Sequence, residues 1–264
     1  RPLRCCPGSS PPDDHEWNAR LDVTPELLRQ RLRSLRDGGY AILPLDAACR
    51  LLRERRLPPR SVALTFDDAS VDFGVAALPI LREFSAPATL YLSSYYTSVR
   101  LPVFNPMLSY VLWKGRDSGA DIAAFCASET RLPVASHAQR ERAYQAIWAH
   151  ATTCSLDAFA KDALVANIAS HLGVSYDEIR SSGVLQLMAP ESVAAIPEDL
   201  VNVQLHTHRH RTPRDKGLFQ RELADNASRI QQIRGASVDL NHFAYPNGVY
   251  RAEMTPGLSE LSVQ

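Results

Sequence analysis

The sequence predicts an α/β fold with parallel strands, interrupted by a long helical insertion. Two short apolar runs, residues 61–66 and 88–92, enclose a helical pattern. The distance from one run to the next matches the roughly 30 residues of a βαβ unit, whose crossover joins parallel strands in an open sheet or a barrel. Residues 93–188 then show helical periodicity without a convincing strand, and strand patterns return only after them.

Composition limits the class of protein. The chain has 264 residues, 45% of them hydrophobic, which suits one large α/β domain and excludes disordered and collagen-like chains. Lysine plus arginine and aspartate plus glutamate each number 29, so the net charge is zero. We therefore expect no nucleic acid partner and no attraction to an anionic membrane. Five cysteines without C-x-x-C spacing indicate neither a disulfide framework nor a thiolate zinc site.

The sequence leaves location and assembly open. No stretch approaches the roughly 18 consecutive apolar residues of a transmembrane segment, and no charged-then-apolar signal sequence opens the chain. Because the first residue is Arg1, we expect either a cytoplasmic protein or an exported one with a truncated N-terminus. The oligomeric state is not indicated.

The N-terminal residues divide into a lead-in and the start of the fold. Residues 1–14 are rich in proline, glycine and serine, so we expect an extended lead-in there and a folded domain over residues 15–264. The first helix is predicted to start at Thr24, whose hydroxyl suits an N-cap, with Pro25 at the first helical position. We expect it to end at Gly38.

Short elements alternate up to the insertion. An apolar segment at residues 40–45 precedes a predicted helix at 46–56, which a Leu-Pro-Pro sequence ends. The β-branched run at 61–66 is typical of a buried strand, and two carboxylates follow it. A helix at 71–84 and a second strand at 88–92 complete the βαβ unit.

The predicted insertion, residues 93–188, lies within the domain. It contains helical windows at residues 138–151 and 156–172. After it the alternation resumes as strand, helix and strand, at residues 200–205, 219–233 and 242–245.

Ionisable side chains follow two of the predicted strands. Asp67 and Asp68 come after the first strand, and His206, His208 and His210 follow the first strand after the insertion. In parallel α/β folds, ligands gather at the carboxyl ends of the strands. Taken alone, the carboxylates also fit a helix cap on a solvated turn, and the histidines also fit a polar loop.

The two segments together point to a metal. Adjacent carboxylates after a buried strand are costly to ionise together unless a cation neutralises them. The spacing of His206 and His210 can bring two imidazoles to one metal. One carboxylate and two imidazoles fill three positions and leave the fourth for water, as in hydrolytic sites, and the second carboxylate can then act as general base.

Three motifs resemble a known family. They are Thr-Phe-Asp-Asp at residues 65–68, His-Thr-His-Arg-His at 206–210, and Phe-Ala-Tyr-Pro-Asn-Gly at 243–248. In order and spacing they resemble the polysaccharide deacetylases of carbohydrate esterase family 4, from about Val23 to the C-terminus. The first two motifs are the more specific ones. The resemblance implies a distorted (β/α) barrel with a helical insertion.

The resemblance also implies an activity and a set of site residues. Asp67 would be the catalytic base, and Asp68, His206 and His210 would hold one divalent metal, zinc in the first place, with cobalt or nickel as alternatives. The implied reaction is hydrolysis of N-acetyl groups on an amino-sugar glycan, with metal-activated water as the nucleophile. The glycan substrate is the one partner expected.

Three further residues would support the reaction by the same resemblance. The hydroxyl of Thr207 would steady the histidine loop. The backbone N–H of Asn247, with the neighbouring Tyr245, would lie on the substrate side and help to hold the oxyanion.

The chain departs from the family pattern at three places. Ala69 stands where glycine is frequent, and we expect a negative φ there. Ala244 stands where many members have an arginine that braces the base. Residues 248–264 contain no histidine to act as the family's late proton donor, so we expect a barrel that is incomplete at the C-terminus. His208 is predicted to point to solvent, and His242 to pack on its strand.

Two alternatives stay open. The same metal site could serve an esterase that removes O-acetyl groups from a polysaccharide. Without the proton donor, the domain could also bind glycans and be catalytically silent. The retained Asp67 argues against a silent domain, because a pure binding module has no need of a base beside the metal.

Overall fold

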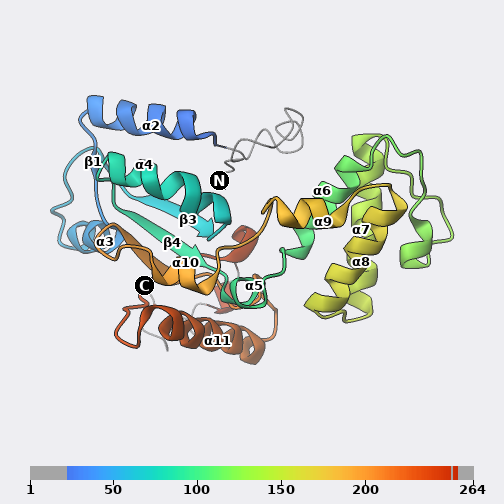
Figure 1. Cartoon of the computed structure of the whole chain (residues 1–264). Coiled ribbons are helices and arrows are strands. Elements are labelled where there is room, and N and C mark those ends of the chain that lie inside the picture. Colours follow the sequence, from blue (N-terminus) through green and yellow to red (C-terminus); the bar gives the residue numbers. More distant parts are fainter. Residues whose placement is uncertain (1–22, 251, 255–264) are drawn as a thin grey trace. The chain divides into compact units, whose positions relative to one another are not determined.

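The computed structural model describes residues 23–250 and 252–254, and it confirms an α/β fold with parallel strands (Figure 1). The described chain forms two compact units. The sheet unit combines the segment up to Val99 with the segment from Leu187 onward, and the helical unit is Arg100–Gln186. The predicted lead-in, residues 1–14, lies outside the described residues.

Three parallel strands form the main sheet of the sheet unit. β3 (Leu64–Asp68), β4 (Ala88–Leu92) and β5 (Val201–Leu205) lie in the order β3-β4-β5. The register aligns their last residues, since Asp68 pairs with Leu92 and Leu92 pairs with Leu205. The chain segments that follow β3, β4 and β5 therefore leave the sheet at one edge.

A second, shorter sheet corrects one of the predicted strands. β1 (Ala41–Ile42) and β2 (Ser61–Val62) pair in parallel, and the run predicted as one strand at residues 61–66 is split between β2 and β3. Within the described ranges the two sheets are separate, and a closed barrel is not observed.

The predicted strand at residues 242–245 is wrong. This segment makes an isolated parallel bridge between Phe243 and Leu205 instead. The side-chain oxygen of Gln204 accepts the N–H of His242 at 2.8 Å, so that N–H does not enter a backbone ladder, and Pro246 follows. The segment nevertheless stays beside β5.

The helices before the second strand start and end largely as predicted. In α2 (Pro25–Asp37) the hydroxyl of Thr24 accepts the N–H of Leu27 at 3.2 Å, which confirms the predicted N-cap. α3 (Leu45–Arg53) is shorter than predicted. The helix predicted at 71–84 contains a π-helical turn, Phe73–Ala77, before α4 (Leu78–Glu83). Pro79 explains the irregularity, because it has no N–H for the normal helical bond.

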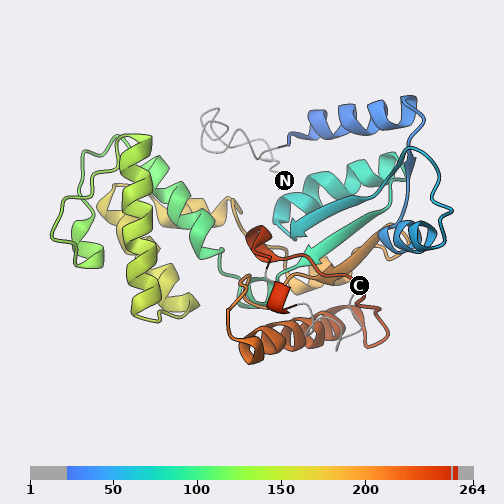
Figure 2. The same ribbon diagram turned by 180° about the vertical axis from the view of Figure 1, so that it is seen from behind.

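The remaining helices of the sheet unit come from both of its segments. They are α5 (Ser94–Val99), α10 (Pro190–Ala194) and α11 (Lys216–Arg234). α2 packs on α4, and α11 packs on β5, α5 and α10, on the other side of the unit from α2 (Figures 1 and 2). No helix within the described ranges is both long and apolar enough to span a membrane.

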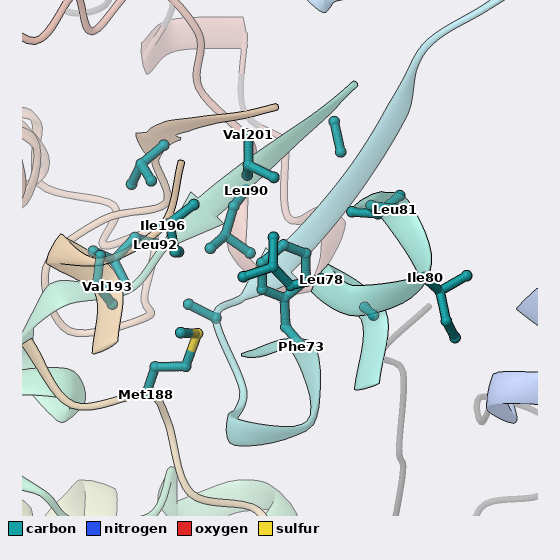
Figure 3. Packing of buried hydrophobic residues seen from close by; sticks show 14 of the residues in the cluster. Phe73, Leu78, Ile80, Leu81, Leu90, Leu92, Met188, Val193, Ile196 and Val201 are labelled. Carbon is teal, nitrogen blue, oxygen red and sulfur yellow. The ribbon is translucent and has the colours of Figure 1, made fainter. Parts of the chain in front are cut away.

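The core of the sheet unit lies on the face of β4 that carries Ala88, Leu90 and Leu92. All five residues of β4 are buried, as expected for a central parallel strand. Figure 3 shows its leucines gathered with side chains of the π-helical turn, of α4 and of the segment that leads into β5. The labelled members of this cluster include Phe73, Leu78, Leu90, Leu92, Met188, Val193 and Ile196.

The helical unit has its own core. Its α-helices are α6 (Phe104–Lys114), α7 (His137–Thr153), α8 (Ala158–His171) and α9 (Tyr176–Ser181). α6 packs on α7 and α8, and buried leucine, isoleucine and aromatic side chains fill the space between them. Residues 100–186 are all described, and their strand pairing is limited to a bridge between Asp121 and Pro133. The predicted helices at 138–151 and 156–172 are confirmed.

Candidate metal centre

The three predicted ligands meet at the edge where the strands end. Asp68 is the last residue of β3, and His206 directly follows β5. His210 lies four residues after His206, in the loop before α11. One carboxylate oxygen and two imidazole nitrogens from these residues all lie within 4.8 Å of one another. Residues far apart in the sequence therefore present three ligand atoms to one point.

The distances leave the carboxylate oxygen facing two ring nitrogens. Asp68 Oδ1 lies 3.3 Å from His206 Nε2 and 3.0 Å from His210 Nε2. Among the described residues this buried oxygen has no hydrogen bond of acceptable geometry. A buried polar atom without a partner is costly. A divalent cation bound by all three atoms would satisfy it, so these residues fit a metal.

The turn after β3 requires an unusual backbone. Asp68 and Ala69 have φ values of 71° and 61°, both in the left-handed region. The expectation of a negative φ at Ala69 is therefore wrong, and glycine would be the less strained residue there. The amide N–H of Met188 donates to the carbonyl of Ala69 at 2.8 Å, which ties the turn to the segment before α10.

His206 is oriented by its second ring nitrogen. Its side chain is almost fully buried, and Nδ1 lies 2.9 Å from the carbonyl oxygen of Ala244. Because a carbonyl can only accept, Nδ1 carries the hydrogen and donates it. The lone pair of the neutral ring is then on Nε2, which faces Asp68, as metal-binding histidines require.

The charges in the centre favour a cation. Burial raises the pKa of Asp68, but the imidazoles of His206 and His210 outweigh it and hold that pKa far below its usual range. Burial lowers the pKa of His206, but the carboxylate of Asp68 outweighs it and the net pKa is raised. Each group thus stabilises the opposite charge, and a metal ion can take the place of the protons.

The loop between the two histidines is closed by Thr207. Thr207 and His210 have φ values of 60° and 51°. The buried hydroxyl oxygen of Thr207 accepts the amide N–H of Arg211 at 3.0 Å across the loop. This contact is compatible with the steadying role, which stays a prediction.

The comparison with protein families decides the assignment. A family model described as polysaccharide deacetylase matches residues 54–264, which is most of the chain. The chain belongs to the polysaccharide deacetylase family. No match to a curated protein was found.

Solved structures share the fold of this family member. The Streptococcus pyogenes deacetylase PplD, in complex with acetate, is 17% identical, with a TM-score of 0.59 over 99% of this chain and 77% of that one. IcaB from Ammonifex degensii is 15% identical, with a TM-score of 0.57 over 99% and 78% of the two chains. At such identities the likeness concerns the fold, and it supports the predicted relation to the deacetylase barrel.

Asp67, the predicted base of this polysaccharide deacetylase family member, lies beside the ligands on β3. It is exposed, and its strand partner in the register is Tyr91 of β4. Burial first, and the charge of Asp67 next, raise the pKa of Tyr91 to about 12. Asp67 also helps to raise the pKa of His206. The negative charge of Asp67 therefore acts on the metal centre, while solvent can reach its carboxylate.

The third motif reaches the metal centre through its backbone. The carbonyl of Ala244 fixes His206, and Pro246–Gly248 forms a turn in which Asn247 has a φ of 56° and is exposed. The ring of Tyr245 lies in an aromatic cluster, stacked on Phe219 with centroids 6.2 Å apart. The substrate roles of Asn247 and Tyr245 stay predictions.

The two other histidines are engaged elsewhere. His208 does not point freely to solvent as predicted, because Nδ1 lies 2.9 Å from the hydroxyl of Ser94 and the ring stands edge-on to Tyr95. α5 therefore packs against the histidine loop. His242 is buried beside β5, and its Nε2 lies 2.6 Å from a carboxylate oxygen of Asp46 in α3.

Two polar residues that were not singled out from the sequence lie beside the histidine loop. Glu222 and Asn226 of α11 are buried, with 1% and 0% of their surface exposed. The sequence did hold a signal for them. They share the buried side of the helix with Leu223 and Ile230, and polar residues on an apolar stripe require partners.

Proposed function

We propose that this chain hydrolyses N-acetyl groups from an amino-sugar glycan and that one divalent metal, zinc in the first place, is held by Asp68, His206 and His210. The carrying observation is the convergence of these three ligand atoms around a buried carboxylate oxygen without a hydrogen bond. Membership of the polysaccharide deacetylase family supports the acetylated glycan as substrate class. A structural neighbour described as a de-N-acetylase, from Aggregatibacter actinomycetemcomitans, favours the N-acetyl over the O-acetyl alternative.

The three ligands leave room for the reaction. Three protein ligands are the number found in catalytic sites, where further positions stay open for water and substrate. A bound metal would polarise the acetamide carbonyl and lower the pKa of a water molecule. The hydrogen bond from His206 to Ala244 keeps Nε2 available as a ligand throughout.

Asp67 supplies the base in this proposal. Its exposed carboxylate lies next to Asp68 in the sequence and can take the proton of the attacking water. The backbone N–H of Asn247 would stabilise the oxyanion. His208 and His242 are bound to Ser94 and Asp46, so neither is proposed as the proton donor to the leaving amine.

The test is acetate release from N-acetylglucosamine oligomers by the zinc-loaded chain. Asp67→Asn should reduce kcat by about 10² to 10⁴, the range for removal of a general base, and should keep stoichiometric zinc. His206→Ala should lose zinc. Unchanged turnover in Asp67→Asn would contradict the assignment of Asp67 as the base. Full zinc occupancy in His206→Ala would contradict the assignment of His206 as a ligand.

Two other results would contradict the proposed activity and favour one of the alternatives. Acetate released only from an O-acetylated polysaccharide such as acetylxylan would make the chain an esterase. Zinc and glycan binding without any acetate release would make it a silent binding domain.

A further inference from the structure

We propose that Glu222 and Asn226 of α11 are positioning residues that fix the two histidine ligands of the metal centre. The inference rests on the proposed function, because it concerns the same three ligands. It adds a role for a helix that contributes no ligand itself, and it is argued from the hydrogen bonds of two buried polar side chains.

Asn226 fixes the backbone of the first histidine. Its Oδ1 accepts the N–H of His206 at 2.9 Å, and its Nδ2 donates to the carbonyl of Leu92 at 2.9 Å and to the hydroxyl of Ser94 at 2.8 Å. One buried amide thus joins the ends of β4 and β5 to α11. Together with the hydrogen bond from the ring Nδ1 to the carbonyl of Ala244, it holds His206 at both its backbone and its side chain.

Glu222 fixes the loop on both sides of the second histidine. One carboxylate oxygen accepts the amide N–H of Arg209 at 2.8 Å. The other accepts the guanidinium groups of Arg209 and Arg211, at 3.2 Å and 2.7 Å. His210 therefore stands between two residues that are bound to the same carboxylate. Its left-handed backbone persists because its neighbours are held in this way.

The spacing of the two residues makes them one device. Residues four apart lie on the same side of a helix, one turn from each other. On α11 they lie among buried apolar residues, where an amide and a carboxylate are costly unless they are hydrogen-bonded. All the side-chain bonds given above lead to the histidine ligands' own segment or to the adjoining ends of β4 and α5.

The direct test measures zinc affinity by competition with a chromophoric chelator. Glu222→Gln removes the charge and replaces one acceptor oxygen by a donor. Asn226→Asp keeps the acceptor for His206 but replaces the donor to Leu92 by an oxygen. Each variant of the full chain should bind zinc about 10 to 100 times more weakly, as expected when a contact that orients a ligand is lost.

The matched control lies on the same helix. Asp225 also pairs with Arg209, at 3.2 Å, but its side chain is 39% exposed and the bond goes to the guanidinium alone. Asp225→Asn should therefore change the zinc dissociation constant by no more than about twofold, since exposed ion pairs contribute little. Arg211→Ala, at a 55% exposed side chain, removes one bond to Glu222 without burying a new group. It should weaken zinc binding about threefold or more, and it serves if Glu222→Gln does not fold.

The outcomes separate this inference from the proposed function. If the wild-type chain binds no zinc, the metal centre and the inference both fail. If the wild type binds zinc and the two α11 variants bind it equally well while their metal-free Tm falls, the residues are merely structural and only the inference fails. Weaker zinc binding in these variants than in Asp225→Asn supports it.

Discussion

At the scale of single residues, the turn after β3 aims the carboxylate ligand. Two successive left-handed residues, Asp68 and Ala69, turn the chain sharply at the end of a buried strand. At Ala69, whose side chain offers no local hydrogen bond, the left-handed backbone costs about 1 to 2 kcal/mol. The hydrogen bond from Met188 to Ala69 helps to keep this conformation. Strain at this turn is therefore part of how the metal centre is built.

Glycine substitution tests this strain. Ala69→Gly relieves the left-handed strain, whereas Ala77→Gly, at an equally buried but right-handed helical position, relieves none. Both lose one methyl group and gain unfolded-state entropy. The free energy of unfolding, measured with urea, should therefore fall by about 1 to 2 kcal/mol less for Ala69→Gly than for Ala77→Gly. Equal losses would show that the turn is unstrained.

Proton binding at the metal centre predicts how stability depends on pH. In the metal-free protein the pKa of His206 is raised above its ordinary 6.5, so its stabilisation is present below about pH 6.5 and lost as the pH rises through the raised value. The pKa of Asp68 is lowered below its ordinary 3.8, so its stabilisation is present above about pH 4 and lost on further acidification.

The pair should therefore stabilise the metal-free protein most between about pH 4 and pH 6.5. Urea midpoints of the wild type and of Asp68→Asn, both stripped of metal, measure this. The advantage of the wild type should be larger near pH 5.5 than near pH 8. An advantage that grows toward pH 8 would contradict the assigned directions.

The convergence of the three candidate ligands could be predicted from the sequence, whereas the contacts that support them could not. Asp68, His206 and His210 carry ligand atoms at the ends of strand patterns, and both signals are local. The turn at Ala69 is held by Met188, and His208 is held by Ser94. Both partners lie far away in the sequence, so a local pattern cannot predict them.

At the scale of elements, α10 depends on a cation from another helix. Nη1 of Arg234, near the end of α11, donates to the carbonyls of Val193, Ala194 and Ile196 at 3.0, 2.9 and 2.7 Å. These carbonyls lie in the last turn of α10 and just after it, where the helix dipole is negative. A five-residue helix without a side-chain N-cap is thereby fixed to its neighbour.

Substitution of this arginine should loosen α10. Arg234→Lys keeps the charge but cannot match the planar group, so we expect a loss of about 1 to 3 kcal/mol in the free energy of unfolding. Glu198 pairs with the same arginine but is 74% exposed, and Glu198→Gln should change stability by less than about 0.5 kcal/mol. Chemical denaturation measures both. Equal effects would assign the stability to the exposed ion pair.

Element prediction failed at two extended segments whose hydrogen-bond partners differ from those of a single regular strand. The apolar run at residues 242–245 has a strand pattern, but Gln204 takes up the N–H of His242. The run at residues 61–66 was predicted as one strand and serves two sheets. Local propensity shows that a segment is extended, and it does not show which partner its N–H groups find.

At the scale of the whole molecule, two separate cores divide the chain. The sheet unit holds all three candidate metal ligands, and the helical unit has its own set of buried side chains. The helical periodicity of residues 93–188 predicted such a unit, although α5, at its start, belongs to the sheet unit. The role of this stretch as an insertion in a barrel stays a prediction.

Zinc should stabilise the two units unequally. A ligand at 100 times its dissociation constant adds about 2.7 kcal/mol to the unit that binds it. Hydrogen exchange followed by mass spectrometry should show slower exchange in β3, β4 and β5 after zinc addition, and little change in α6, α7 and α8. Equal protection of both units would show that they unfold together.

The position of the helical unit in the sequence also determines when the metal centre can form. Asp68 lies before this unit and both histidines lie after it, so the first ligand leaves the ribosome long before the other two. Closing so long a loop has an entropic cost that the packing of β3, β4 and β5 must offset first. In the proposed metal centre, metal capture would thus be a late event in folding. A nascent chain would hold no metal until the sheet was in register, so the bound ion would mark a completed fold.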